Sequence, residues 1–220
     1  MVIRVLVLAL LLASPCAAQT CPPPGVFVPE RKVSLSTGMG VPVYSSELSR
    51  AQVNALAGRL GQLSGGKVVG LTQSEVEGKV LPQFWTVDLG GGQSCLGLGR
   101  VDGFWRLRDL IVHIASEYGP GGCNYAKVRL HEDEHVAIAR ETFQRWAPRL
   151  EDALRREAGG ISPMVVPLGQ VERRREEITQ RLFRSLNPPM DGFRAELRDR
   201  NAAIDTAANY RLVMSRCPSW

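Results

Sequence analysis

The chain has 220 residues, of which 44% are hydrophobic, and its formal net charge is +5. This length and composition are typical of a globular protein with a real hydrophobic core. The excess arginines lie among acidic residues on amphipathic helices and are not interleaved with aromatic residues on one face, so the charge does not predict a nucleic-acid partner.

The first 18 residues have the pattern of a secretory signal peptide. A positive segment ends at Arg4, an apolar run of Leu and Val follows, and small residues lead to Ala18. This run is too short to anchor a chain in a bilayer, and no later run is long enough to cross one. We expect residues 1–18 to be removed, although a buried N-terminal helix is the alternative. Residues 19–220 would then form a single domain that is periplasmic or extracellular, without stable membrane insertion.

Four cysteines remain after this cleavage. They are Cys21, Cys95, Cys123 and Cys217. An even number in an oxidising compartment predicts two disulfide bonds. Three pairings are possible, and we favour Cys95–Cys123 with Cys21–Cys217, which would tie a loop to the central helix and one terminus to the other. A cysteine zinc site is the alternative, but no pair has the CxxC spacing.

Residues 30–118 are predicted to be rich in strands. Loose alternation over 32–44 predicts one or two short strands, and a Ser-capped apolar pattern predicts a helix over 46–63 that ends at two glycines. Two apolar segments on either side of the glycines 90–92 predict a hairpin. A further apolar run over 104–118 predicts another strand.

Residues 125–213 are predicted to be helical. The first helix covers about 125–159, where Pro148 could start a second helical piece after a kink. A second helix covers 171–186 and a third covers 193–213. The order of elements predicts an α+β fold, in which a small, partly antiparallel sheet packs on the long first helix and two further C-terminal helices follow.

The strongest chemical signal is the sequence HEDEH at residues 131–135. Residues four apart lie on the same face of a helix, so His131 and His135 can bind one tetrahedral Zn²⁺. Glu132 can then act as the general base toward a zinc-activated water. The two histidines share a stripe with Ile138, on the side expected to face the core. A polar helix face with two surface histidines is the alternative.

With this motif in place, the strand, turn and helix over 107–146 resemble the zincin superfamily of metallopeptidases. The stretch 123–136 is also loosely similar to small exported proteobacterial proteins that carry HExxH and have a poorly defined function. The zincin resemblance implies zinc at the two histidines, Glu132 as the general base, and a peptide or protein substrate held along an edge strand. The strand around 110–115 is the expected edge.

The HExxH motif supplies two zinc ligands and does not identify the third. Metzincins continue with a Gly and a third His, where this chain has Ile138 and Glu141. Other zincins take an acidic ligand from a later helix. The candidates are Glu141, Glu172, Glu176 and Asp205. We favour Asp205, because Asn201, Asp205 and Asn209 form a polar strip beside the apolar stripe of the third predicted helix.

Two other polar residues could belong to a site. Tyr210 could stabilise an oxyanion, although a packing role is the alternative, and His113 lies in an apolar strand and is expected to be a core histidine. Together the patterns predict a secreted zinc-dependent hydrolase, most simply a metallopeptidase. The alternatives are a zinc amidase acting on cell-wall peptides, and a disulfide-stapled binding or inhibitor module whose HExxH is degenerate or accidental.

Overall fold

The computed structural model describes residues 20–61 and 68–220. The predicted signal peptide, and the glycines expected to end the first helix, lie outside these residues. None of the helices in the described part is long and apolar enough to cross a bilayer.

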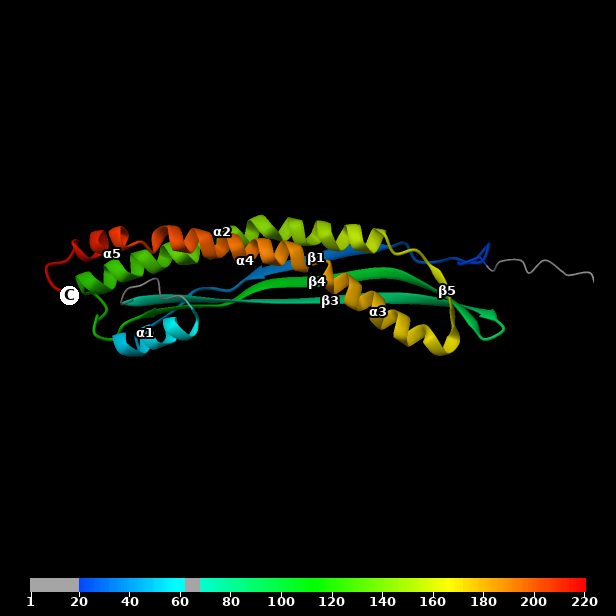
Figure 1. Cartoon of the computed structure of the whole chain (residues 1–220), viewed down its shortest axis with the longest axis horizontal. Coiled ribbons are helices and arrows are strands. Elements are labelled where there is room, and N and C mark those ends of the chain that lie inside the picture. The colour runs from blue at the N-terminus through cyan, green and yellow to red at the C-terminus, as the bar shows by residue number, and fades with distance from the viewer. Residues whose placement is uncertain (1–19, 62–67) are drawn as a thin grey trace, which may run out of the picture.

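A long β-hairpin is the frame of the fold (Figure 1). Strands β3 (Gly70–Gly90) and β4 (Gln93–Ile114) pair antiparallel along their length. Gly90, Gly91 and Gly92 form the turn with φ of 75°, 60° and 76°, a conformation that only glycine adopts at low cost. The predicted hairpin is therefore confirmed. The segment predicted as a separate strand over 104–118 is part of the same hairpin up to Ile114, where β4 ends, and residues 115–118 are not in a strand.

Three shorter strands complete the sheet, and all of them pair with β4. Strands β1 (Lys32–Met39) and β2 (Val43–Ser45) are parallel to it, and β5 (Met164–Pro167) is antiparallel. In the described part of the chain this gives a mixed sheet of five strands, which confirms the partly antiparallel sheet. The prediction that 110–115 is an edge strand is wrong, because β2 and β3 flank this part of β4 on opposite sides. In this part of the sheet β2 and β3 are the outer strands.

Helix α2 (Cys123–Gly159) is the long helix predicted to carry the HExxH motif. Pro148 lies inside it and does not divide it, so the prediction of a second helical piece is wrong. Phe143 and Leu150 on either side of Pro148 are almost fully buried in the core. Their packing outweighs the hydrogen bond that proline removes.

The remaining helices are arranged around the sheet and α2. Helix α1 (Arg50–Arg59), capped by Ser49, lies across the sheet from α2 at one end of the molecule (Figure 1). After a short 3₁₀ turn (Leu168–Gln170), α3 (Val171–Arg184) covers the region near the hairpin turn. The third predicted helix is in fact two helices, α4 (Asn187–Ile204) and α5 (Ala207–Met214), because Thr206 leaves the helical conformation and caps α5.

The core joins β4, α2 and α4 through three aromatic rings. Trp105 of β4 stacks on Phe143 of α2 at 4.0 Å between ring centroids, and Phe193 of α4 meets Trp105 edge-on at 5.2 Å. Gly192 precedes Phe193, and a Cβ atom there would come within 2.2 Å of the Trp146 ring. Helix α4 can therefore approach α2 closely only with glycine at this position. This contact sets the position of α4 along α2.

Two disulfide bonds are present, as predicted, but they join different cysteines. Cys21 pairs with Cys95, and Cys123 pairs with Cys217. Cys95 lies near the start of β4 and Cys123 lies after its end, so the length of one extended strand, roughly 60 Å, separates them. A disulfide needs Cα atoms less than about 7 Å apart, which excludes the favoured pairing.

Peptide mapping of the unreduced protein should recover the Cys21–Cys95 and Cys123–Cys217 linkages, with the free thiols blocked during digestion. Replacing Cys123 and Cys217 by Ser should lower the free energy of unfolding by about 2–4 kcal/mol, because the cross-link closes a long loop in the unfolded chain. Denaturant unfolding measures this loss, with the Cys21→Ser/Cys95→Ser protein for comparison. A peptide linking Cys95 to Cys123 would contradict the structure.

Candidate metal centre

Two side chains of α2 and one from the end of α4 converge on a single point. Asp205 Oδ1 lies 3.1 Å from His131 Nε2 and 3.1 Å from His135 Nε2, and the two nitrogen atoms are 3.3 Å apart. Around a tetrahedral ion with bonds of about 2.0–2.1 Å, neighbouring ligand atoms are about 3.3 Å apart. The three atoms therefore fit one triangular face of such a tetrahedron. His131, His135 and Asp205 can hold a metal ion.

The local backbone explains how Asp205 reaches the histidines. Asp205 is the residue that ends α4, with φ −85° and ψ 42°, and Thr206 begins the cap of α5. The chain therefore bends at Asp205, next to the histidine face of α2. A helix continuing through 193–213, as predicted, would not have this bend. The structure brings together the three residues predicted as ligands, although the backbone at Asp205 differs from the prediction.

Asn201, one turn before Asp205, orients His135. Asn201 Oδ1 accepts a hydrogen bond from His135 Nδ1 at 2.9 Å, which places the proton on Nδ1 and directs the Nε2 lone pair toward the cluster. Partners of this kind are typical of metal-binding histidines. His131 Nδ1 is buried and has no hydrogen-bond partner among the described residues. Asn209, the other member of the predicted polar strip, instead donates a side-chain hydrogen bond to the carbonyl group of Ile204 at the end of α4.

Burial and the neighbouring charges shift the pKa values of Asp205 and His135 in opposite directions. Burial alone would raise the pKa of Asp205, but the hydrogen bonds from both histidines hold this pKa well below its usual range. Burial alone would lower the pKa of His135, but Asp205 and Glu132 raise it to about 9. The carboxylates therefore favour a positive charge between the two rings. A metal ion can supply that charge in place of a proton.

Glu132 lies under β3, next to the cluster. Its side chain is 3% exposed, and Thr72 Oγ1 donates a hydrogen bond to Glu132 Oε2 at 2.8 Å. A Cβ atom at Gly70 would come within 2.5 Å of Glu132 Oε1, so glycine leaves the space that the carboxylate occupies. Burial raises the pKa of Glu132, against the opposing effect of the histidine charges. Thr72 and Gly70 could not be found from the sequence, because they come from a strand about 60 residues earlier.

Tyr210 of α5 also faces the cluster. Its hydroxyl group is 3.4 Å from Asp205 Oδ1, and its ring lies 5.6 Å from the His131 ring. Burial and then the charge of Asp205 raise the pKa of Tyr210, so the hydroxyl keeps its proton. The group is therefore a hydrogen-bond donor at the cluster and not only a packing residue.

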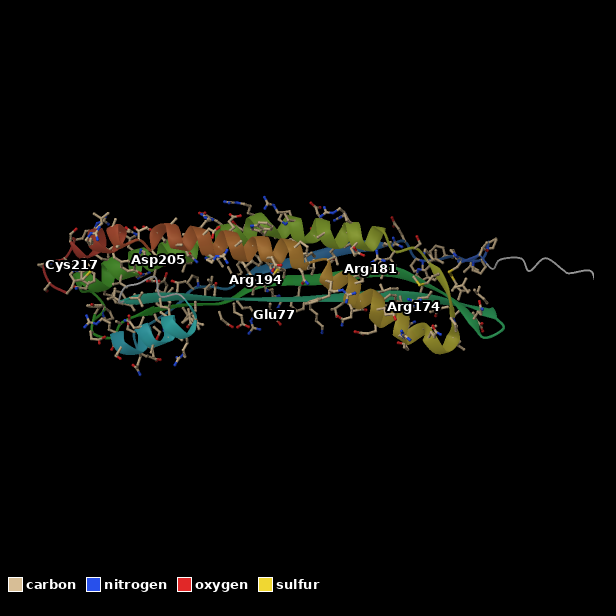
Figure 2. The ribbon with its side chains drawn as sticks, viewed as in Figure 1. Glu77, Arg174, Arg181, Arg194, Asp205 and Cys217 are labelled. Atoms are coloured by element: carbon tan, nitrogen blue, oxygen red, sulfur yellow. A yellow bond between two sulfur atoms is a disulfide. The ribbon has the colours of Figure 1, made fainter. Side chains whose placement is uncertain are left out.

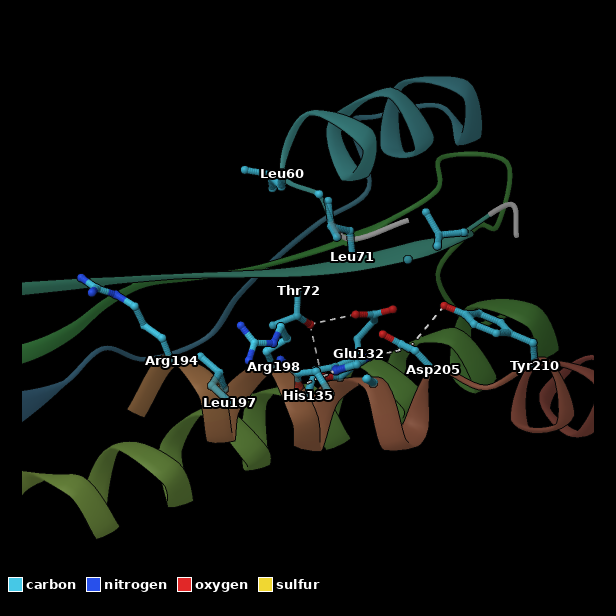
Figure 3. A pocket seen from close by; sticks show the side chains of 15 residues that line it. Leu60, Leu71, Thr72, Glu132, His135, Arg194, Leu197, Arg198, Asp205 and Tyr210 are labelled. Carbon is cyan, nitrogen blue, oxygen red and sulfur yellow. Dashed lines mark hydrogen bonds and ion pairs between the residues drawn. The ribbon is translucent and has the colours of Figure 1, made fainter. Parts of the chain in front are cut away.

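The cluster opens into a cavity of 390 Å³ between β3 and α4 (Figure 3). Glu132, His135, Asp205 and Tyr210 all line it, and Thr72 contributes from β3. A small molecule or an extended chain in this cavity would therefore lie against His135 and Asp205 of the cluster.

The other acidic candidates for a ligand lie elsewhere. Glu141 pairs with Arg200, Glu172 pairs with Arg175, and Glu176 accepts a hydrogen bond from Gln180. His113 is also outside the cluster and bonds Gln73 through its Nε2 atom.

The three-residue cluster predicts binding of about one Zn²⁺ per chain. His131→Ala, His135→Ala and Asp205→Ala should each weaken binding by orders of magnitude, because each removes one of three protein ligands. Titration against a coloured chelator measures the affinity. His113→Ala is the matched control and should bind as the wild type does. Unchanged affinity in Asp205→Ala would show that the carboxylate is not a ligand.

Asn201→Ala should keep the metal but bind it about 10- to 100-fold more weakly, because it removes the acceptor that fixes the His135 ring. Asn187→Ala, at an exposed position at the other end of α4, is the comparison and should leave metal affinity as it is. Equal affinities for the two variants would mean that Asn201 has no orienting role.

Comparison with known proteins does not assign this chain to a family. No family model, curated protein or solved structure matches the chain. The function is therefore inferred from the residues of the cluster and the cavity beside it.

Proposed function

We propose that the protein is a zinc-dependent hydrolase and that it cleaves peptide bonds. One observation carries the proposal: His135 and Asp205, two of the three cluster residues, line the same cavity as the buried Glu132. A purely structural metal site is closed by protein ligands, whereas a catalytic site keeps one position open. Two nitrogen ligands and one oxygen ligand at these spacings suit Zn²⁺.

Bound zinc would lower the pKa of a coordinated water toward about 7 and polarise a carbonyl group. Glu132 supports the proton transfers, because it lies beside the cluster and its carboxylate is held by Thr72 of β3 and not by the histidines. Thr72 holds one carboxylate oxygen and leaves the other to accept a proton and return it to the leaving amine.

Tyr210 supports the same reaction from the other side of the cluster. Its hydroxyl group stays protonated and lies close to Asp205. A donor at this position can stabilise negative charge on a substrate oxygen in the transition state. Figure 3 shows Glu132 and Tyr210 directed toward the same region beside Asp205.

The free side of β3 suits an extended peptide. Strand β3 pairs with β4 on one side, and no other strand pairs with it in the described part of the chain. Leu71 and Thr72 point to opposite faces of β3, yet both line the cavity, so the cavity reaches around the strand edge. A peptide could therefore add to β3 by main-chain hydrogen bonds, with its carbonyl group near the cluster.

Export from the cytoplasm is part of the proposal. The N-terminal pattern predicts a cleaved signal peptide, and the two disulfide bonds are typical of an oxidising compartment. A hydrolase at this location would act in the periplasm or outside the cell.

Glu132→Gln should keep zinc and the fold but lose turnover by on the order of 10²-fold or more, because glutamine accepts Thr72's hydrogen bond and is not basic. Cleavage of a mixed peptide library, read by mass spectrometry with and without chelator, measures the loss. Glu134→Gln is the matched control, because Glu134 is exposed on the same helix.

Chelator-sensitive cleavage that persists undiminished in Glu132→Gln would refute the role of Glu132. If the zinc-loaded wild type cleaves neither library peptides nor cell-wall peptides, the hydrolase proposal fails and a binding module becomes the better explanation. Cleavage of cell-wall peptides alone would favour the amidase.

A further inference from the structure

The metal cluster lies between two cavities and not beside one. The second cavity has a volume of 300 Å³ and contains His131, whereas the first contains His135. Gly70, Glu132 and Tyr210 line both cavities and form their common boundary. A substrate whose reacting carbonyl lies at the cluster would therefore have one part in each cavity.

The first cavity, here called the arginine cavity, contains Arg194 and Arg198 of α4. These side chains are four residues apart and lie along the cavity below β3 (Figure 3). Their ion-pair partners, Asp191 and Asp199, are 73% and 74% exposed, so these pairs are weak and screened by water. A carboxylate of a ligand can replace them and bind a guanidinium group through two parallel hydrogen bonds.

The second cavity, here called the aromatic cavity, has mostly apolar walls. Tyr118 and Trp220 meet edge-on at 5.6 Å, and aliphatic side chains such as Val128 and Val213 complete the lining. The disulfide bond between Cys123 and Cys217 and the hydrogen bond from Asn124 to the carbonyl group of Ser219 hold the C-terminal segment against α2. The walls of the cavity are therefore fixed in place before a ligand arrives.

The direction of β3 gives the order of the substrate residues. Gly70 lines both cavities, Val69 lines the aromatic cavity, and Val68, Leu71 and Thr72 line the arginine cavity. The order follows from the long axis of the molecule: along the direction of β3, Cys217 beside the aromatic cavity comes first, then Asp205, then Arg194 of the arginine cavity (Figure 2). A peptide that adds antiparallel to β3 runs the opposite way. Its residues before the scissile bond lie in the arginine cavity, and its residues after the bond lie in the aromatic cavity.

We infer that the substrates are peptides with acidic residues before the scissile bond and a large apolar residue directly after it. This inference rests on the proposed hydrolase function and names its substrate class. The reaction is ordinary hydrolysis: the C–N bond breaks, the hydroxyl group of water joins the acyl carbon, and the proton goes to the leaving amine.

Binding of metal-directed probes tests the arginine cavity without any need for turnover. Acetyl-Glu-Glu-Ala-hydroxamate should bind the zinc-loaded protein about fivefold or more tightly than acetyl-Lys-Lys-Ala-hydroxamate at low salt, as measured by calorimetry. The Arg194→Gln/Arg198→Gln protein should lose this preference. The control, Arg173→Gln/Arg174→Gln, removes the same charge from α3 at the far end of the molecule and should keep the preference (Figure 2).

A second probe pair tests the aromatic cavity. A succinyl hydroxamate carrying a benzyl group should bind about tenfold or more tightly than the same compound without it, because the ring leaves water for an apolar site. Val213→Trp, which fills the cavity, should abolish that gain and keep the preference for the Glu probe. The two variants therefore affect different halves of the ligand.

The outcomes separate the two proposals. If acetohydroxamate binds the zinc-loaded protein but the Glu and Lys probes bind equally, or the benzyl group gives no gain, the substrate inference is overturned and the metal site stands. If neither acetohydroxamate nor any extended probe binds, the open metal position is wrong, and the proposed function fails together with the inference.

Discussion

Two histidines on α2 can form a metal site with Asp205 only because α4 packs along the same helix. Gly192 lets α4 approach the Trp146 ring, and Phe193 fills the space beside Trp105 of the sheet. This contact places the end of α4, and with it Asp205, opposite the histidine face. A core contact far from the cluster therefore determines where the candidate third ligand lies. A shift of α4 by one residue would separate the Asp205 carboxylate from both histidine rings.

The elements around the cluster meet there for different physical reasons. Helix α2 presents its histidines through helical spacing, whereas α4 presents Asp205 by ending at that residue. Strand β3 contributes no ligand, but it holds Glu132 through Thr72 and gives it space at Gly70. The atoms that could bind a metal ion are thus held by helices, and the neighbouring carboxylate is held by a strand.

Several expectations failed where distant segments meet. Cysteine count predicted two disulfide bonds, but the pairing depended on the length of β4, which separates Cys95 from Cys123. The apolar residues of 110–115 predicted a strand. Its neighbouring strands come from other parts of the chain, and these neighbours give it a central position in the sheet. The local preference of Pro148 is to break the helix. The buried side chains around it pack in the core and keep α2 continuous.

The amino-acid sequence by itself determined the elements whose cause is local: the glycine hairpin turn, the long amphipathic helix, and the two histidines and the glutamate on it at HExxH spacing. Helical periodicity and turn conformation depend on neighbouring residues, so they are readable in the chain. Only the tertiary structure decided that Asn201 orients His135, that Thr72 holds Glu132, and that one cavity lies on each side of the cluster. These relations join segments about 60 residues or more apart, and packing of the whole core, not local preference, sets the distances between them.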